Sequence, residues 1–205
     1  MPGGQRAGKI MFILDTENLI NTLKENNQTL WEYALNQEME RSGRTREELR
    51  EQMDQSLSVM ERSAQKARRE PVRSVSGLTG GNACLYEQYR QEGKSLLGEV
   101  ASLAVGMALS CSEINASMQC IVACPTAGSC GIVPAAVLAC AQSRGLDREC
   151  MVNALFTASA IGIIIGSRAT VSGAEGGCQA ECGAAAAMGA AAVTEMLGGS
   201  PEAAF

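Results

Sequence analysis

Charged residues are spread very unevenly along this chain, and their distribution limits the folds that it can adopt. Residues 1–94 hold 14 Lys and Arg and 14 Asp and Glu, whereas residues 95–205 hold only 3 and 8. Aromatic residues make up 3% of the 205 residues, so Ala, Gly, Val, Ile, Leu and Met must fill the interior of the second part. Small side chains let backbones approach closely. We therefore expect residues 95–205 to be mostly interior and to pack as closely spaced helices.

Local patterns predict helices almost throughout. Thr45 and Glu48 have the spacing of a capping box, and an apolar residue recurs every three or four positions from Leu49 to Ala64. Residues 10–14 are interpreted as a short strand or as the approach to a helix. The apolar stretches after residue 95 lack the alternation of half-buried strands, and none belongs to a repeating βαβ unit. The predicted fold class is all-α, with Ala/Gly-rich packed helices.

Composition also argues against several classes of function. A formal charge of −5 argues against a nucleic-acid binder, and the absence of His excludes His-based triads and His-ligated metal sites. The longest apolar stretch, 151–166, is shorter than the ~20 residues that a membrane span needs, and it contains polar residues. Residues 1–9 lack the apolar region of a secretory signal. We therefore expect a cytoplasmic protein that binds neither membrane nor nucleic acid.

Three glycine-rich turns stand where helices are predicted to begin. We call residues 76–81 the first turn, residues 125–131 the second and residues 172–178 the third. None matches a dinucleotide fingerprint or a P-loop. Free backbone N–H groups and hydroxyls at a helix N-terminus can bind an anion, so three converging turns would suit a small carboxylate ligand. The alternative is that the glycines only allow tight turns between crowded helices.

Nine cysteines without a secretory signal argue against a disulfide framework. Most of them are interpreted as small buried hydrophobic residues. The alternative is that some bind a soft metal or an iron–sulfur cluster. Cys130 and Cys178 lie at the edges of the second and third turns, and Cys182 has a spacing that would allow it to pair with Cys178.

Four segments resemble the α chain of iron–sulfur-dependent L-serine dehydratase. They are Ser76-Gly-Leu-Thr-Gly-Gly81, Glu113-Ile-Asn-Ala-Ser-Met118, Pro125-Thr-Ala-Gly-Ser-Cys-Gly-Ile132 and Gly173-Ala-Glu-Gly-Gly-Cys-Gln-Ala-Glu-Cys-Gly183. The resemblance implies a lyase subunit of amino-acid metabolism and gluconeogenesis that acts with a separate β chain. It also implies a [4Fe–4S] cluster held by three cysteines, with one iron open to L-serine, which is converted to pyruvate and ammonia. On this interpretation residues 1–75 form a charged N-terminal helical segment and residues 76–205 the catalytic helical core, within one domain overall.

The resemblance also implies individual site residues. The substrate-binding set is Ser76, Gly77, Thr79, Gly80, Asn115, Thr126, Gly128, Ser129 and Gly173. Cys178 is the implied cluster ligand, whereas Cys130 and Cys182 are not transferred as ligands. Two further family ligands belong to Cys-Asp-Pro-Val-Ala-Gly and Val-Pro-Cys stretches that this sequence does not contain. The catalytic base stays unassigned, with Glu175, Glu181 and the tyrosines as candidates.

The end of the sequence carries the signals of a helix start. Ser200, Pro201 and Glu202 fit an N-cap, a first-turn proline and an early acidic residue, and three residues follow them. We therefore expect the catalytic core to lack its C-terminal part and the chain alone to hold no stable cluster. Two alternatives remain open: a non-catalytic subunit that binds a partner, and a different metal protein that uses Cys120, Cys124 and Cys130.

Overall fold

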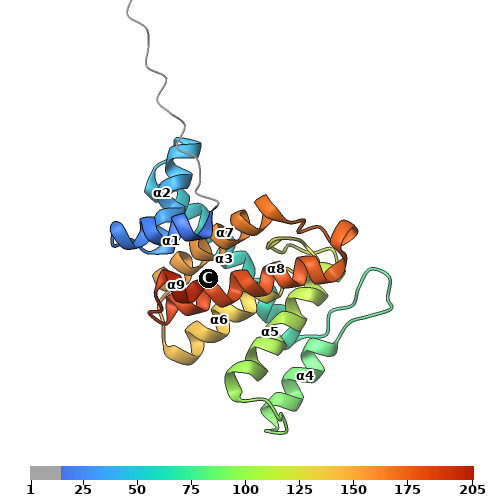
Figure 1. Cartoon of the computed structure of the whole chain (residues 1–205). Coiled ribbons are helices and arrows are strands. Elements are labelled where there is room, and N and C mark those ends of the chain that lie inside the picture. Colours follow the sequence, from blue (N-terminus) through green and yellow to red (C-terminus); the bar gives the residue numbers. More distant parts are fainter. Residues whose placement is uncertain (1–14) are drawn as a thin grey trace, which may run out of the picture.

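The computed structural model describes residues 15–205, and within that range the fold is all-α, as predicted. Figure 1 shows the helical arrangement. The helices are α1 (Thr16–Glu25), α2 (Leu30–Ser42), α3 (Arg46–Arg69), α4 (Asn82–Gln91), α5 (Glu99–Ala116), α6 (Ile132–Arg144), α7 (Arg148–Arg168), α8 (Gly173–Met196) and α9 (Pro201–Ala204). One isolated bridge, between Arg73 and Gly80, is the only β pairing among these residues. The interpretation of residues 10–14 lies outside the described residues.

Side-chain caps start the first three helices, and one of these caps is the predicted capping box. Thr45 and Glu48 form the predicted capping box, in which the Glu48 N–H donates to the Thr45 hydroxyl at 3.2 Å. Thr29 and Glu32 form a second capping box at α2, and Asp15 caps α1. These caps satisfy N–H groups that have no partner inside the helix.

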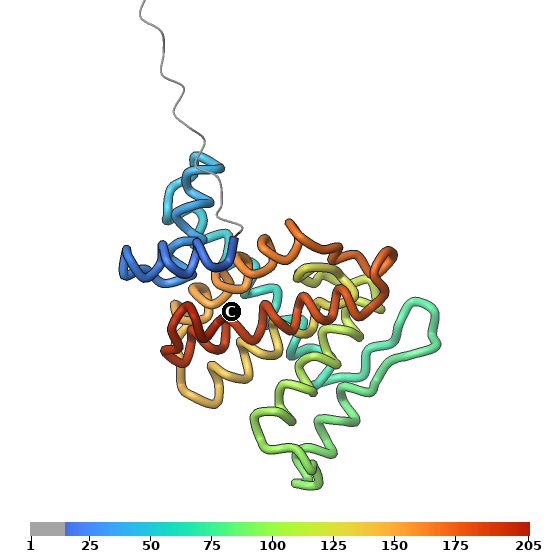
Figure 2. Tube along the Cα trace, viewed as in Figure 1, coloured from blue at the N-terminus to red at the C-terminus, as the bar shows by residue number. Residues whose placement is uncertain are grey.

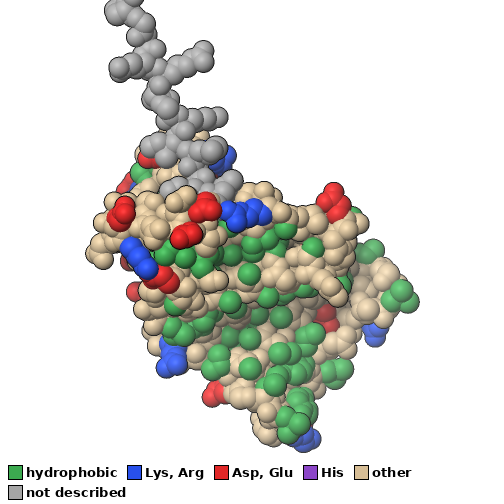
Figure 3. All heavy atoms as spheres, in the orientation of Figure 1, with side chains coloured by type: hydrophobic (Ala, Val, Ile, Leu, Met, Phe, Trp, Pro, Cys, Tyr) green, Lys and Arg blue, Asp and Glu red, His purple; other side chains and the backbone are tan. Residues whose placement is uncertain are grey.

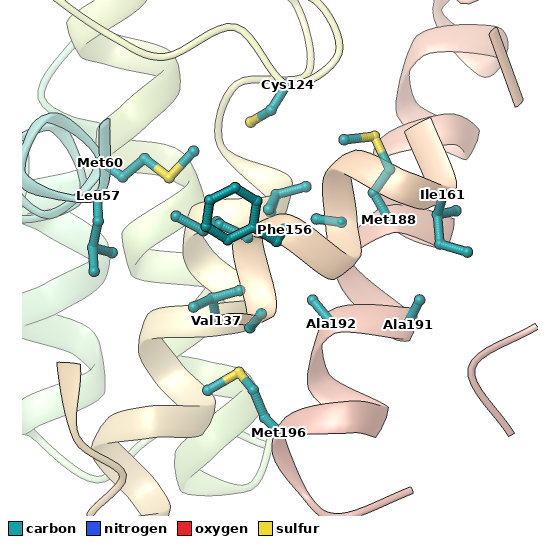
Figure 4. Close-up of a cluster of buried hydrophobic side chains, with 14 of the residues drawn as sticks. Leu57, Met60, Cys124, Val137, Phe156, Ile161, Met188, Ala191, Ala192 and Met196 are labelled. Atoms are coloured by element: carbon teal, nitrogen blue, oxygen red, sulfur yellow. The ribbon is translucent and has the colours of Figure 1, made fainter. Parts of the chain in front are cut away.

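The core lies between α3, α5, α6, α7 and α8. Helix α3 packs along α5, while α8 packs against both α6 and α7 (Figures 1 and 2). Figure 4 shows part of this core, with Phe156 near Val137 and Met188. The small residues allow the close approach expected from composition. A Cβ added to Gly131 would lie 2.7 Å from the carbonyl oxygen of Ala108 on α5.

Helix α7 is the only helix within residues 15–205 that is long and apolar enough to cross a membrane. Half of its 18-residue apolar window is buried inside the fold. Its buried residues include Phe156 and Ile161, which belong to the main hydrophobic cluster. This burial fits the interpretation of α7 as a core helix.

Glu195 joins the N-terminal helices to the core. The N–H groups of Leu30 and Trp31, at the start of α2, donate to its two carboxylate oxygens at 2.7 and 3.2 Å. The hydroxyl of Thr157 on α7 also donates to Glu195. One carboxylate on α8 therefore connects α2 and α7, which lie far apart in the sequence.

Candidate active site

The first turn is a tight loop between α3 and α4. The N–H of Ser74 donates to the carbonyl of Thr79 at 2.9 Å, and the N–H of Gly81 donates to Val72 at 3.1 Å. Gly80 has a φ of +131°, and a Cβ added there would lie 2.2 Å from the Val72 carbonyl oxygen. Glycine at position 80 is therefore required by the turn itself.

The predicted substrate residues of the first turn mostly face solvent. Ser76, Gly77 and Thr79 are exposed, and Gly80 is half-buried. The N–H of Val75 donates to the carbonyl of Ala116 at 3.1 Å, which places this turn beside the last residue of α5.

The N-terminus of α4 is already occupied by a carboxylate from this chain. Glu113 on α5 is 8% exposed and accepts hydrogen bonds from the N–H groups of Asn82, at 2.6 Å, and Ala83, at 3.2 Å. The sequence reasoning missed this role. The signal was present, because Glu113 opens one of the motifs that carry the family resemblance, but it lies 31 residues from Asn82.

The second turn leads into α6 and is held by hydrogen bonds inside itself and from α5. The hydroxyls of Thr126 and Ser129 lie 3.1 Å apart, and Ser129 is only 1% exposed. The side-chain amide of Asn115 donates to the carbonyl of Ala127 at 3.0 Å. The structure therefore brings Asn115 and the second turn together. The first turn also meets α5 at its C-terminal end.

The third turn forms the start of α8, which is kinked at Gly177. Gly177 has φ +72° and ψ 175°, and the exposed Cys178 follows directly after this kink. Three residues further along, Glu181 accepts a hydrogen bond from the Thr126 hydroxyl of the second turn. Glu181, three residues past the third turn, thus joins the start of α8 to the second turn. Thr126 and Ser129 use their hydroxyls in contacts within this joint, and their predicted role in substrate binding stays a prediction.

The cysteines divide into a buried and a more accessible group. Cys111, Cys124, Cys130 and Cys140 are buried, which confirms the interpretation of these four as small core residues. Burial raises the pKa of Cys111 to about 11 and that of Cys124 to about 12, so both remain neutral thiols near neutral pH. Cys178 is exposed, and Cys182 is only partly buried.

Within residues 15–205, no group of three or more Cys, Asp or Glu side chains is placed to hold a metal ion. This finding gives no support to the alternative metal site at Cys120, Cys124 and Cys130, of which Cys120 is exposed while the other two are buried. It also means that the described residues do not form a complete ligand set for a [4Fe–4S] cluster. Cys178 is exposed beside the kink at Gly177, so its thiolate is accessible to act as one ligand of such a cluster.

The structure is thus a helical fold in which Glu181, three residues after the exposed thiol of Cys178, contacts a glycine-rich turn that carries hydroxyl groups. This chain belongs to the serine dehydratase alpha chain family, whose model matches residues 25–205. It is 45% identical over 188 residues to the probable L-serine dehydratase, alpha chain, of Bacillus subtilis (strain 168), covering 92% of this chain and 62% of the relative. It is 42% identical over 184 residues to the L-serine dehydratase, alpha chain, of Peptoniphilus asaccharolyticus, covering 90% of this chain and 63% of the relative. The chain thus spans about three fifths of the length of these relatives, and the family resemblance is confirmed.

Proposed function

We propose that this chain acts as the alpha subunit of an L-serine ammonia-lyase, which converts L-serine to pyruvate and ammonia. The observation that carries the proposal is the family match over residues 25–205. The Bacillus subtilis and Peptoniphilus asaccharolyticus relatives, which align with most of this chain, are both named as L-serine dehydratase alpha chains. The pyruvate formed would enter amino-acid metabolism and gluconeogenesis, and we place the reaction in the cytoplasm.

The substrate is proposed to bind where the second turn meets α5. Asn115 is half-buried and fixes Ala127, so the backbone N–H groups around Gly128 have a defined orientation. Oriented N–H groups in a glycine-rich turn favour a carboxylate such as that of serine. The first turn adds exposed hydroxyls from Ser76 and Thr79 beside the same end of α5. The base that removes the α-proton stays unassigned.

The cofactor is proposed to be a [4Fe–4S] cluster with Cys178 as one thiolate ligand. The proposal follows from the resemblance to iron–sulfur-dependent L-serine dehydratase, and the chain belongs to the serine dehydratase alpha chain family. When bound, an iron with an open position would act as a Lewis acid toward the serine hydroxyl. Among the described residues, Cys178 is the one whose exposure and place at the end of the third turn suit this role.

The partner is proposed to be a serine dehydratase β chain, because the relatives are alpha chains. Large exposed apolar side chains support a partner-binding role. They gather on and around α4 and the start of α5: Val75, Leu78, Leu85, Leu96, Leu97 and Val100. Figure 3 shows apolar side chains over this part of the molecule. Neither nucleic acid nor a membrane is part of the proposed assembly.

The proposal can be tested by measuring pyruvate formation from L-serine. The chain would be joined to the part of the Bacillus subtilis relative that it does not match, combined with a β chain, and reconstituted anaerobically with iron and sulfide. We expect turnover of L-serine that is abolished by Cys178→Ser and retained by Cys120→Ser, which changes another exposed thiol. Equal turnover in the Cys178→Ser assembly would contradict the proposed ligand, and no pyruvate from any assembly would contradict the proposed function.

A further inference from the structure

Two glycines of the joined turns are explained by one side chain. A Cβ added to Gly128, in the second turn, would lie 2.5 Å from Oε1 and 2.8 Å from Cδ of Glu181. A Cβ added to Gly173, in the third turn, would lie 2.9 Å from the same Oε1. Both distances are shorter than real Cβ contacts, so the Glu181 carboxyl occupies the space that a side chain at either position would need.

Backbone conformation does not explain these two glycines. Gly77, Gly80 and Gly177 have positive φ values that favour glycine, whereas Gly128 and Gly173 do not. Their lack of a Cβ leaves room for the carboxyl group at the end of the flexible Glu181 side chain. This is a reason for glycine that differs from both sequence-based interpretations, an anion site and a tight turn.

The carboxylate also makes a directed contact. Thr126 in the second turn donates its hydroxyl hydrogen to Oε2 of Glu181, and the Thr126 oxygen lies 3.1 Å from the hydroxyl of Ser129. Because the hydroxyl of Ser129 also lies 3.3 Å from the carbonyl of Cys124, this series of contacts extends into the buried base of the turn. Glu181 thus acts both as a spacer between two backbones and as a hydrogen-bond acceptor.

We propose that Glu181 is a positioning residue that holds the second turn against the third and so fixes the second turn relative to Cys178. Glu181 lies three residues after Cys178 on the same helical segment, so the two move together. A carboxylate that contacts Gly128 and Thr126 transmits that position to the second turn. Only the identity of the ligands that the two turns bind rests on the proposed function, and the positioning role of Glu181 does not.

Hydrogen–deuterium exchange on the full chain tests this role without requiring activity. We expect Glu181→Ala to increase amide exchange about tenfold in residues 125–131 and in residues 172–178, because both turns lose their shared contact. Glu181→Gln keeps an acceptor and the side-chain size, so exchange should stay within about twofold of the unaltered chain. Retained helical circular dichroism would show that the variants fold.

Glu175→Ala is the matched control. Glu175 lies on the same helix but accepts its hydrogen bond from Thr170, at 2.6 Å, beside the third turn. Its removal should increase exchange in residues 170–177 and leave residues 125–131 unchanged. The proposal would be overturned if Glu181→Ala left residues 125–131 unchanged, or if Glu175→Ala loosened them equally.

A double-mutant cycle tests the spatial argument. Gly128→Ala alone should loosen the same two turns as Glu181→Ala, because the new methyl group displaces the carboxyl. In the Glu181→Ala background the methyl group has room, so adding Gly128→Ala should increase the amide exchange of the two turns by less than about twofold. If the increase in amide exchange in the double variant equalled the product of the two single increases, the role of Glu181 as a spacer would be overturned.

The KM for L-serine of the assembled enzyme separates this inference from the proposed function. A raised KM in Glu181→Ala, restored in Glu181→Gln, would support both. Loosened turns with an unchanged KM would contradict the assignment of the turns to substrate and leave the role of Glu181 intact. Unchanged exchange in both turns would overturn that role whatever the KM.

Discussion

Replacing Glu87 with Gln should destabilise the fold, because Glu87 is the centre of a buried ion-pair cluster. Glu87 on α4 is 7% exposed, and Arg68 on α3 is 9% exposed. The Arg68 Nε donates to the Glu87 carboxylate at 3.0 Å, and the Arg90 Nη2 donates at 2.7 Å. A Cβ added to Gly106 on α5 would lie 3.5 Å from both Arg68 and Glu87, so the cluster packs directly under α5.

The pKa of Glu87 sets the size of the effect. Burial raises this pKa, but hydrogen bonds from Arg90 and Arg68 outweigh the burial and lower it from 4.5 to about 2. That difference corresponds to roughly 3 kcal/mol of folding free energy at neutral pH. Removing one partner of a buried ion pair costs about 3–5 kcal/mol, which agrees with this value.

The pH dependence has a definite sign. A carboxyl whose pKa is lowered by folding stabilises the native state above its unfolded pKa, near 4.5, and loses this contribution as the pH falls toward 2. Glu87→Gln lacks the titrating group. The difference in unfolding free energy between the unaltered chain and the variant should therefore be about 3 kcal/mol at pH 7 and shrink toward zero near pH 2.

Urea unfolding followed by far-ultraviolet circular dichroism, repeated between pH 7 and pH 3, measures this difference. Glu92→Gln is the control, because Glu92 pairs with Lys94 at 2.6 Å where both side chains are largely exposed. That pair should contribute less than about 1 kcal/mol. A cost for Glu87→Gln below about 1 kcal/mol, or a cost that does not change with pH, would refute the reasoning.

Three further predictions follow from burial and close contacts. In the folded chain, iodoacetamide should label Cys178 but leave Cys124 unlabelled until urea is added, because burial raises the pKa of Cys124; equal labelling by peptide mass spectrometry would contradict this. Glu195→Ala should cost about 2–4 kcal/mol in urea unfolding, because two N–H groups and one hydroxyl lose their acceptor. Gly131→Ala should destabilise the fold by about 1–3 kcal/mol, because the new Cβ would meet the α5 backbone. Gly166→Ala has open space around it and should stabilise the fold by about 0.5–1 kcal/mol. A higher melting temperature for Gly131→Ala than for Gly166→Ala would contradict the packing argument.

Local signals in the sequence predicted the helices well. The capping box at Thr45 involves residues three positions apart, and the start of α9 depends on Ser200 and the adjacent Pro201. Such contacts can be inferred from a short window because every partner lies within it. The all-α fold follows in the same way from long apolar stretches without strand alternation.

The candidate site is held together by contacts between residues that lie far apart in the sequence, and no short sequence window contains both partners. Thr126 and Glu181 are 55 residues apart, and Glu113 lies 31 residues from the N–H of Asn82 that donates to it. The family resemblance predicted Gly128 and Gly173 as substrate-binding residues. It could not show that the Glu181 carboxyl occupies the space beside both of them, because that depends on how α8 folds back onto the second turn.

Several of the few charged residues in 95–205 have specific structural roles. Glu113 caps α4, Glu195 caps α2 and Asp147 caps α7, so three of the eight acidic residues satisfy N–H groups at the starts of helices. Arg144 and Arg168 stand in the last turns of α6 and α7, where the helix dipole favours a positive charge. Glu181 differs from these residues. Its carboxylate lies beside Gly128 and Gly173 and accepts a hydrogen bond from the Thr126 hydroxyl, and not from the N–H groups at the start of a helix. A carboxylate placed apart from the capping pattern, at the contact between two turns of the proposed site, is better explained by the geometry of that site than by helix stability.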